Sequence, residues 1–445
     1  MKNLEFNRLN IILGWVLTLL AAVVYSITME DTVSFWDCGE FIASAYKLLV
    51  GHPPGAPFFA LLGRVFIIFG GDNPGNAAVM VNYLSVVSSA LTIGFLFWTI
   101  SALCIKMFKT MDGATSVAWT QERIVLTLGS AAIGALAYTF SDTFWFSAVE
   151  GEVYALSSLF TAVVFWAILK WDADVDKGVV VADRWILLIA YLMGLSIGVH
   201  LLNLLTIPAI GLIYYYKRYP RKKYGDLIAI GVSLVVLLFI QYGIIPGTIK
   251  IAAGLERLFA NSLNMNFGMG FFFFLLAVAG GLAYGIYRTN KLGKQILNLG
   301  LWSIAVVVIG YSSYSIIFIR SMANTTMDEN NPENVYSMIS YLNRDQYGDR
   351  PLFYGQYFDA RVVEIEEGKP IRMKAYVVRD EKGKQVSVFG LEHDANTFIE
   401  QSGSGFTIDH EYVEVDKKPK YVYEDSRQTV FPRMYSPSGH HVNAY

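Results

Sequence analysis

The sequence predicts an α-helical polytopic membrane protein with about nine transmembrane helices, followed by a C-terminal region outside the membrane. Three observations support this fold class. Hydrophobic residues make up 54% of the 445 residues and charged residues only 16%, whereas soluble globular domains carry about 25% charged residues. The mean hydropathy is +0.41, so much of the apolar surface must face lipid. The net charge of −2 gives no indication of a nucleic-acid partner.

Apolar runs that approach or reach spanning length recur along the first 320 residues. A helix needs about 20 residues to cross a hydrocarbon core of about 30 Å. The first run is too long for a signal peptide and lacks a clear cleavage site, so we interpret it as a retained helix. The fifth and sixth runs are short and meet at His200, which predicts a tight helical hairpin. The runs lie at 9–29, 77–105, 124–140, 153–171, 185–199, 201–216, 226–245, 269–287 and 295–319.

Basic residues in the connecting segments predict the orientation, because Lys and Arg accumulate in cytoplasmic loops. With the N-terminus inside, cytoplasmic segments hold 15 of them and short outer loops hold 4. The chain would then be a multi-pass protein of the bacterial inner membrane, with a periplasmic C-terminal region. The inner residues are Lys2, Arg8, Lys106, Lys109, Arg123, Lys177, Arg184, Lys217, Arg218, Arg221, Lys222, Lys223, Arg288, Lys291 and Lys294, and the outer ones are Lys47, Arg64, Lys250 and Arg257.

The first outer loop, residues 30–76, is long for a helical bundle. Residues 37–50 and 57–69 have amphipathic patterns and are too short to span, which predicts two interfacial helices. Between them, residues 51–55 read Gly-His-Pro-Pro-Gly, a rigid turn because neither proline can donate a backbone hydrogen bond. The loop would hold its carboxylates at the membrane surface. These carboxylates are Glu30, Asp31, Asp37 and Glu40.

Asp37 and Glu40 permit two compatible interpretations. Asp at a helix start with Glu three residues later has the capping-box pattern, and both charges would be favoured by the helix dipole. A capped helix start is also a fixed position for a catalytic carboxylate. The two cysteines, Cys38 and Cys104, would lie on opposite faces of the membrane and could not pair.

The second outer loop and the predicted hairpin supply further candidates. Glu150 and Glu152 either cap the fourth helix or face the outer side as binding groups, and the aromatic residues 144–146 fit an interfacial belt. His200, with Asn203 beside it, either bonds to backbone at the hairpin tip or faces an outer cavity and binds an anion. Arg257 is a weaker candidate on the outer side. No Cys/His cluster has metal-ligand spacing, no Gly-rich phosphate loop follows a strand, and no cofactor is expected.

The sequence changes character after about residue 320. A polar stretch ending in Asn331-Pro332 is a turn and helix-start signal. A helix is predicted over 332–346, followed by extended segments at 351–357, 371–378, 385–391 and 412–423. We therefore expect a membrane domain over 1–320 and an extramembrane α+β region over 321–445.

Several of these motifs resemble a family of membrane proteins of formerly unknown function. That family includes the eukaryotic transmembrane protein O-mannosyltransferase and many large bacterial members. The similarity covers essentially the whole chain and is most specific in the first loop. Since bacterial members usually continue beyond this length, the resemblance implies that the chain is part of a longer protein. The matching segments are 37–43, 50–55, 145–156, 194–200, 328–334 and 344–351.

The resemblance implies the GT-C glycosyltransferase fold, with a catalytic carboxylate in the first outer loop. The donor would be a polyprenyl-phosphate sugar, most often mannose, and the acceptor a Ser or Thr hydroxyl on a translocated protein, transferred with inversion. Asp37 would be the base and Glu40 would support it, while His52 would orient substrate or brace the turn. His200 or Arg257 would bind the leaving phosphate, and a metal requirement stays open. Candidate substrate-binding residues are His52, Glu150, Glu152, His200, Asn203 and Arg257.

Two other functions remain open from the sequence. A transporter or flippase of a lipid-linked substrate would have inverted repeats with helices broken at mid-bilayer, and the sequence shows neither. A non-catalytic membrane scaffold would use the α+β region for binding, which the intact carboxylates of the first loop disfavour. Activity with a lipid-linked donor would separate all three.

The charge bias yields a first prediction, which concerns topology. A reporter enzyme that works only outside the cytoplasm should be active when it is fused after residue 340. A reporter that works only in the cytoplasm should be inactive there. The reason is the excess of basic residues on the other side of the predicted helices. A fusion at residue 180 is the control and should give the opposite result. Activity of a cytoplasmic reporter at residue 340 would contradict the orientation.

Overall fold

The computed structural model describes residues 2–348, 351, 353–368, 370–403, 405–417, 420–432 and 438–444. Its contacts divide the chain into two units. One unit comprises Met1–Ile244 and Gly280–Glu333, and the other comprises Ile245–Ala279 and Asn334–Tyr445. Residues 321–333, which the sequence assigned to the outer region, therefore group with the membrane helices. Each unit is described here by itself.

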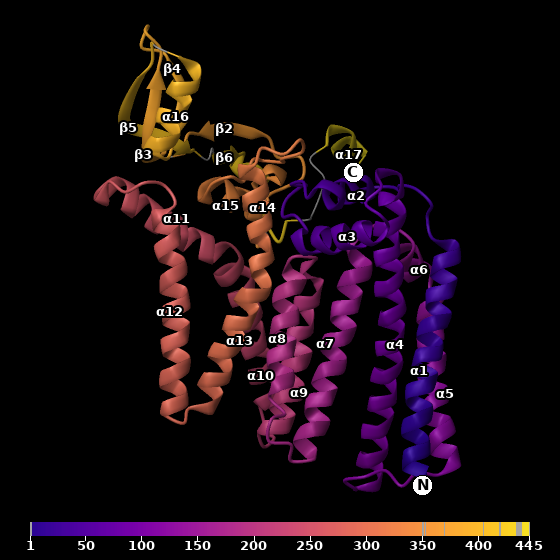
Figure 1. Cartoon of the computed structure of the whole chain (residues 1–445). Coiled ribbons are helices and arrows are strands. Elements are labelled where there is room, and N and C mark those ends of the chain that lie inside the picture. Colours follow the sequence, from indigo (N-terminus) through magenta and orange to yellow (C-terminus); the bar gives the residue numbers. More distant parts are fainter. Residues whose placement is uncertain are drawn as a thin grey trace. The chain divides into compact units, whose positions relative to one another are not determined.

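The first unit is helical (Figure 1). The helix α12 (Met269–Lys291) passes from the second unit into it. Its long helices are α1 (Lys2–Thr28), α4 (Ala77–Asp112), α5 (Gln121–Thr139), α7 (Val153–Asp176), α8 (Arg184–Ile197), α9 (Ile207–Arg218), α10 (Gly225–Leu238) and α13 (Gln295–Tyr311). Shorter elements are α2 (Cys38–Lys47), α3 (Pro57–Phe69), η1 (Pro74–Asn76), α6 (Asp142–Ala148), η2 (Leu201–Thr206), η3 (Phe239–Ile244), η4 (Ser312–Tyr314) and α14 (Ser315–Met322).

Among the described residues, six helices are long and apolar enough to cross a membrane, or seven if a bent pair counts as one span. That pair is α5 with α6, which meet at 68°. All nine predicted segments are largely helical, but the predicted count of nine spans is not confirmed. The reason lies in the hairpin, because α8 and α9 have only 14 and 12 residues. The chain is nevertheless a multi-pass membrane protein by the length and composition of its helices.

Helix packing in the first unit is centred on α4, which contacts α1, α5 and α7. Two glycines set another close approach, that of α8 and α13. A Cβ on Gly194 would lie 2.4 Å from the carbonyl oxygen of Val307, and one on Gly310 would lie 2.5 Å from the nitrogen of Leu195. Small residues allow such backbone contact between membrane helices. In Figure 1, α2 and α3 lie across the ends of α4 and α7.

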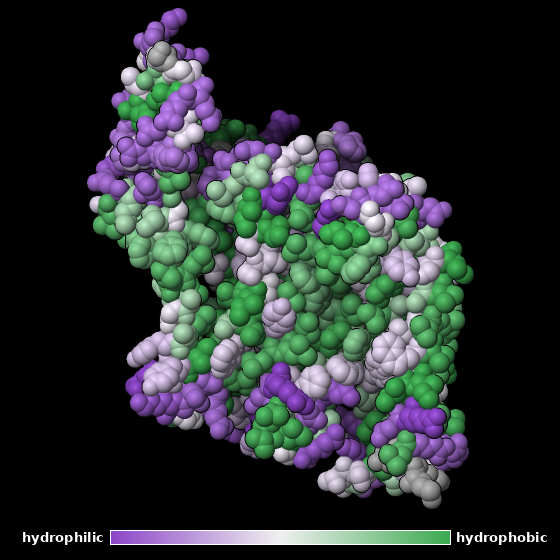
Figure 2. Space-filling model, in the orientation of Figure 1, coloured by the Kyte–Doolittle hydropathy of each residue, from purple (hydrophilic) through white to green (hydrophobic). Residues whose placement is uncertain are grey.

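Charged residues gather at the opposite end of these helices. Lys217 lies 2.8 Å from Asp172, and so does Lys106. Figure 2 shows a hydrophobic band over the helices of this unit, between hydrophilic ends. Both lysines are among the basic residues that the sequence places on the inner side. The aromatic belt predicted for residues 144–146 is only partly found, since Phe144 is 5% exposed and packs in the core with Tyr25.

The second unit combines α11 (Ile245–Leu263) with the predicted α+β region. The predicted helix is α15 (Val335–Asn343), and Asn334 caps it. Its antiparallel pairs are β4-β3-β5, β1-β7 and β2-β6. The bounds are β1 (Tyr354–Gln356), β2 (Val362–Glu366), β3 (Ile371–Arg379), β4 (Gln385–Phe389), β5 (Thr407–Asp416), β6 (Lys420–Tyr423) and β7 (Gln428–Val430), with η5 (Asp345–Tyr347), α16 (Glu392–Ser402), η6 (Asp425–Arg427) and α17 (Gly439–Ala444).

The content of three or more strands and one helix is confirmed, while β2, β7 and α16 were not predicted. Alternating residues Met373, Ala375 and Val377 of β3 are buried, which is the period of two that made this strand predictable. Asn261 of α11 extends the pairing of β3, because its amide accepts from the backbone N–H of Lys374 at 3.0 Å and donates to the carbonyl of Arg372 at 2.9 Å.

Candidate active site in the first outer loop

Asp37 precedes the first residue of α2 but does not cap the helix. Its backbone has helical angles and its side chain makes no capping hydrogen bond. Glu40, the other half of the predicted capping box, bonds to His52 instead. The capping-box interpretation is therefore wrong, because a partner twelve residues further along the chain takes the Glu40 carboxylate. Neither side chain therefore caps α2.

Glu40 and His52 form the closest contact of the site. Oε1 of Glu40 lies 2.8 Å from Nδ1 of His52 and accepts the backbone N–H of His52 at 2.7 Å. An ionised carboxylate can only accept, so Nδ1 carries the proton of the ring. Gly51 makes room for this contact, since a Cβ there would lie 2.3 Å from the same Oε1. The turn then closes with a bond from the N–H of Gly55 to the carbonyl of His52, 2.8 Å long.

Asp37 lies on the other side of the His52 ring. Its Oδ2 is 4.0 Å from Nε2, and its side chain is 57% exposed, against 22% for Glu40 and 25% for His52. The ring therefore stands between two carboxylates that differ in accessibility. Glu40 is engaged on the protein side, and Asp37 is open to an incoming group.

The pKa shifts agree with this division. Burial alone would raise the pKa of Glu40, but the hydrogen bonds from the ring and backbone of His52 outweigh it and lower that pKa. The same side-chain bond raises the pKa of His52 against the effect of burial, and the charges of Glu40 and Asp37 add to the increase. The pair is thus ionic over a wider pH range than either group alone.

Glu150 and Glu152 of the second loop are only 4% and 6% exposed. Glu150 accepts a hydrogen bond from the hydroxyl of Ser34 at 2.8 Å. Glu152 accepts the N–H of Val153 at 3.0 Å and so caps α7, as one interpretation predicted. Burial raises the pKa of Glu150, and it raises that of Glu152 to about 7, where the nearby charges of Asp37 and Glu150 add to the effect.

Cys38 joins the two loops, and sequence reasoning did not assign it to the site. Its side chain is fully buried. Burial, together with the charges of Glu150 and Glu152 and a hydrogen bond to Glu150, raises the pKa of the thiol to about 12. The only sequence signal was its place between Asp37 and Glu40. Asn82 of α4 was also missed by sequence reasoning. Its amide donates to the carbonyls of Glu30 and Thr32 in the first loop, at 2.7 and 3.0 Å.

His200 lies at the hairpin, where its Nδ1 accepts the N–H of Leu202 at 3.2 Å. The backbone-bonded interpretation is thus correct in kind, with an N–H as the partner. The ring also contacts Tyr154 of α7, at 5.4 Å between centroids. The hairpin meets the first loop directly, because the N–H of Phe58 donates to the carbonyl of Gly198 at 2.8 Å.

Asn203 is fully buried, and its amide nitrogen donates to the hydroxyl of Ser196 at 3.1 Å. Its Oδ1 has no hydrogen-bond partner among the described residues. Arg257 lies on α11 of the second unit with an exposed side chain, whereas the cluster described here belongs entirely to the first unit. In the described part of the chain, no three His, Cys, Asp or Glu residues are grouped to hold a metal ion.

Comparison with known proteins confirms the resemblance that the motifs indicated. Residues 37–223 match the family described as "Protein O-mannosyl-transferase TMEM260 N-terminal domain". Residues 348–445 match a second one, described as "Family of unknown function (DUF8416)". The first match begins at Asp37 and extends past His200, so it contains the whole cluster.

Two curated relatives carry the same name. The chain is 25% identical over 144 residues to the protein O-mannosyl-transferase tmem260 of Dictyostelium discoideum. It is 28% identical over 154 residues to the protein of that name from Mus musculus. The matched parts cover 32% and 34% of this chain but only 15% and 18% of the relatives. No solved structure matches the chain.

The raised pKa of Glu152 yields a prediction for stability. A carboxyl whose pKa rises from 4.5 in the unfolded chain to about 7 in the folded one stabilises the fold below pH 4.5. That contribution is lost as the pH rises through about 7. Glu152→Gln keeps the cap but cannot ionise, so its thermal stability relative to the wild type should increase from pH 5 to pH 8, by on the order of 2 kcal/mol. Melting in detergent at both pH values measures this.

The exposed Glu122→Gln is the matched control and should show no such trend. A difference between Glu152→Gln and the wild type that is the same at pH 5 and pH 8 would contradict the buried, protonated state of Glu152.

Proposed function

We propose that this chain is a membrane glycosyltransferase that transfers mannose from a polyprenyl-phosphate donor to Ser or Thr hydroxyls of translocated proteins. The names of the relatives support the class of reaction. The observation that carries the proposal is the exposed Asp37 beside the Glu40–His52 pair, at one end of the membrane helices. The GT-C fold, the bacterial inner membrane and the periplasmic orientation belong to the same proposal.

Asp37 would act as the general base. A hydroxyl is a weak nucleophile, so its proton must be removed as its oxygen attacks the anomeric carbon. The new bond forms between that oxygen and the carbon, and the bond from the carbon to the phosphate oxygen breaks. The proton goes to Asp37 and the electron pair leaves with the phosphate. A single displacement of this kind inverts the anomeric centre.

Glu40 and His52 would position the base. Because Glu40 holds Nδ1, the opposite nitrogen of the ring is turned toward Asp37. A positively charged ring there attracts the Asp37 carboxylate and limits its movement. His200 is proposed as a donor to the leaving phosphate, where charge develops in the transition state. Arg257, the alternative donor, belongs to the second unit, and its role stays a prediction. Glu150, Glu152 and Asn203 are proposed to bind hydroxyl groups of the substrates.

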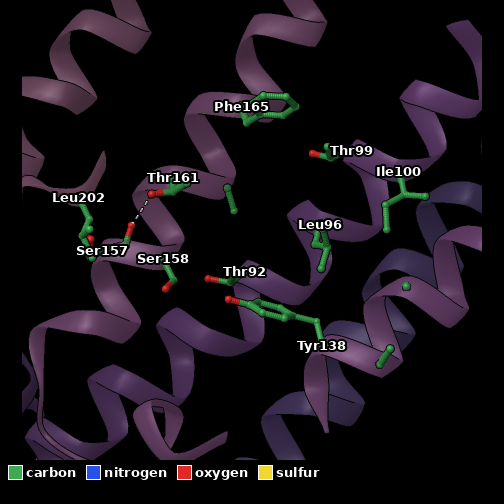
Figure 3. A pocket seen from close by; sticks show the side chains of 13 residues that line it. Thr92, Leu96, Thr99, Ile100, Tyr138, Ser157, Ser158, Thr161, Phe165 and Leu202 are labelled. Atoms are coloured by element: carbon green, nitrogen blue, oxygen red, sulfur yellow. Dashed lines mark hydrogen bonds between the residues drawn. The ribbon is translucent and has the colours of Figure 1, made fainter. Parts of the chain in front are cut away.

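A cavity inside the helical bundle supports the lipid-linked donor. Its volume is about 720 Å³, and α4, α5 and α7 form its walls (Figure 3). Two of its hydroxyl groups, those of Thr92 and Thr161, donate to carbonyls of their own helices, and most of the lining side-chain atoms are carbon. The lining therefore offers mainly carbon atoms, which suits a hydrocarbon chain. The cavity extends from Leu202, beside the hairpin of His200, to Phe165.

The base assignment yields the next prediction. Asp37→Asn should lower the rate of mannosyl transfer by about 10²–10⁴-fold, the range for loss of general-base help. Folding should be unaffected, since the side chain of Asp37 makes no capping bond. The measurement is transfer of labelled mannose from polyprenyl-phosphate mannose to extracytoplasmic proteins in proteoliposomes.

Asp31→Asn provides the control, because Asp31 is exposed in the same loop and lies outside the matched motif. Its transfer rate should equal that of the wild type. If Asp37→Asn protein inserted normally and transferred mannose at the wild-type rate, the assignment would be wrong. A selective loss in Glu40→Gln would then make Glu40 the base.

The cavity yields a separate prediction. Ala162→Trp should fill part of it and raise KM about tenfold or more for a long polyprenyl donor. KM for a donor with a short, ten-carbon chain should stay unchanged, because a short chain does not reach this depth. Ile133→Trp is the control, since Ile133 is 71% exposed on the outside of α5. An equal effect of Ala162→Trp on both donors would exclude the cavity as the site of the chain.

A further inference from the structure

The segment that follows the last helix of the first unit returns to the turn of the candidate site. The N–H of Val50 donates to the carbonyl of Met327, and the N–H of Glu329 donates to the carbonyl of Val50, both at 3.1 Å. Val50 and Asp328 form a parallel bridge. Val50 is only two residues before His52. The backbone that carries His52 is therefore paired with residues far away in the sequence.

A second contact joins this segment to the C-terminal end of α2. Arg320 of α14 donates from Nε to the carbonyl of Leu48 at 2.8 Å and from Nη2 to the carbonyl of Lys47 at 3.2 Å. These carbonyls end α2, where no helical N–H remains to bind them. Leu48 has a φ of 50°, which is uncommon for a residue other than glycine. Arg320 thus fixes a helix end that is not favourable by itself.

The segment is also closed on itself. The hydroxyl of Ser321, which is fully buried, lies 3.0 Å from Oδ2 of Asp328 and 3.1 Å from Oδ1 of Asn331. Asn330 and Asn331 both have positive φ, at 61° and 41°, a conformation that asparagine tolerates better than most residues. Residues 320–331 therefore form a fixed loop, which we call the strap.

The strap brings one more carboxylate to the site. The ring of His52 interacts electrostatically with Glu40 and Asp37 of the α2 start, with Glu329 of the strap and with Glu152 at the start of α7. The backbone bond between Glu329 and Val50 explains how Glu329 reaches this place. No sequence pattern indicated the pairing, since about 280 residues separate the two segments.

We propose that the strap, residues 320–331, holds the α2–α3 turn and that Glu329, placed there by its backbone bond to Val50, is a positioning residue that adds negative charge beside His52 and Asp37. The role at the reaction rests on the proposed function. The attachment of the strap and the effect on His52 do not, and they can be measured on the protein without any substrate.

The attachment can be tested through Cys38, which is fully buried in the site. In a Cys104→Ser background it is the only cysteine of the chain. Arg320→Ala should increase its rate of maleimide labelling about tenfold or more, because α2 loses the partner of its C-terminal carbonyls. Arg218→Ala removes a comparable contact, with Asp183, at the other end of the bundle and should leave the rate unchanged.

Ser321→Ala, which opens the strap without removing a charge, should also increase labelling. It replaces Arg320→Ala if that variant does not fold, as judged by gel filtration. Labelling of Cys38 at the wild-type rate in both folded variants would overturn the strap.

Glu329→Gln separates charge from structure. It keeps the backbone bond to Val50, so Cys38 labelling should stay at the wild-type rate. Loss of the carboxylate should lower the pKa of His52, because a nearby negative charge favours the imidazolium form. NMR of histidine-labelled protein reports this, with His52→Gln identifying the signal among six histidines.

The control for this measurement is Glu333→Gln, which lies beyond the strap. An unchanged pKa of His52 in Glu329→Gln would overturn the positioning role. If transfer is measurable, its pH profile should move to lower pH, in the same direction as the pKa of His52. If neither the wild type nor any variant transfers mannose, but labelling and NMR give the expected results, the proposed function is wrong and the role of the strap is supported.

Discussion

The bond between Glu40 and His52 is the interaction on which the candidate site depends. One carboxylate oxygen accepts both the ring and the backbone N–H of His52, so it fixes the side chain and the main chain together. It also keeps a proton on Nδ1 of the ring, because the carboxylate can only accept. Without it, Glu40 would be a half-buried charge with no partner, which is costly. Its removal would also free the turn at Pro53 and Pro54.

This bond explains how four carboxylates can lie near one another. Like charges in one place repel, and proteins usually respond by giving each group a different environment. The hydrogen bonds from His52 lower the pKa of Glu40, whereas burial raises the pKa of Glu150 and of Glu152. Asp37 is the most exposed of the four, with 57% of its side chain exposed against 22% for Glu40. This accessibility is the reason why Asp37, and not one of the other three, is proposed as the base.

The membrane class and the candidate residues of the first loop could be identified from the sequence because both rest on local signals. Apolar runs identify helices wherever lipid is the solvent, and Asp37, Glu40 and His52 lie within 16 residues. The capping box failed because local spacing cannot reveal that Glu40 binds a residue beyond its own helix. The strand β2 was missed since all its residues are exposed, so it has no alternating pattern. Glu329 reaches the site only through backbone pairing, which leaves no pattern in side chains.

The helix α2 shows why distant parts of the chain are needed. It has ten residues, and isolated helices shorter than about 12 residues are barely stable in water. Its N-terminal end is held by Glu40 on His52 and by Cys38 on Glu150, and its C-terminal end by Arg320. Negative groups thus lie at the positive end of the helix dipole and positive groups at the negative end, which is the favourable arrangement.

Each end contact of α2 also places a group of the site. The N-terminal contacts set Asp37 beside His52, and the C-terminal contact fixes the residues that lead to the turn. A change at Arg320 would therefore reach Asp37 through a helix only ten residues long. The same contacts that make this short helix stable also set the distance between its carboxylates and the histidine. A substitution that breaks one of these contacts should therefore change both the stability of α2 and the geometry of the candidate site.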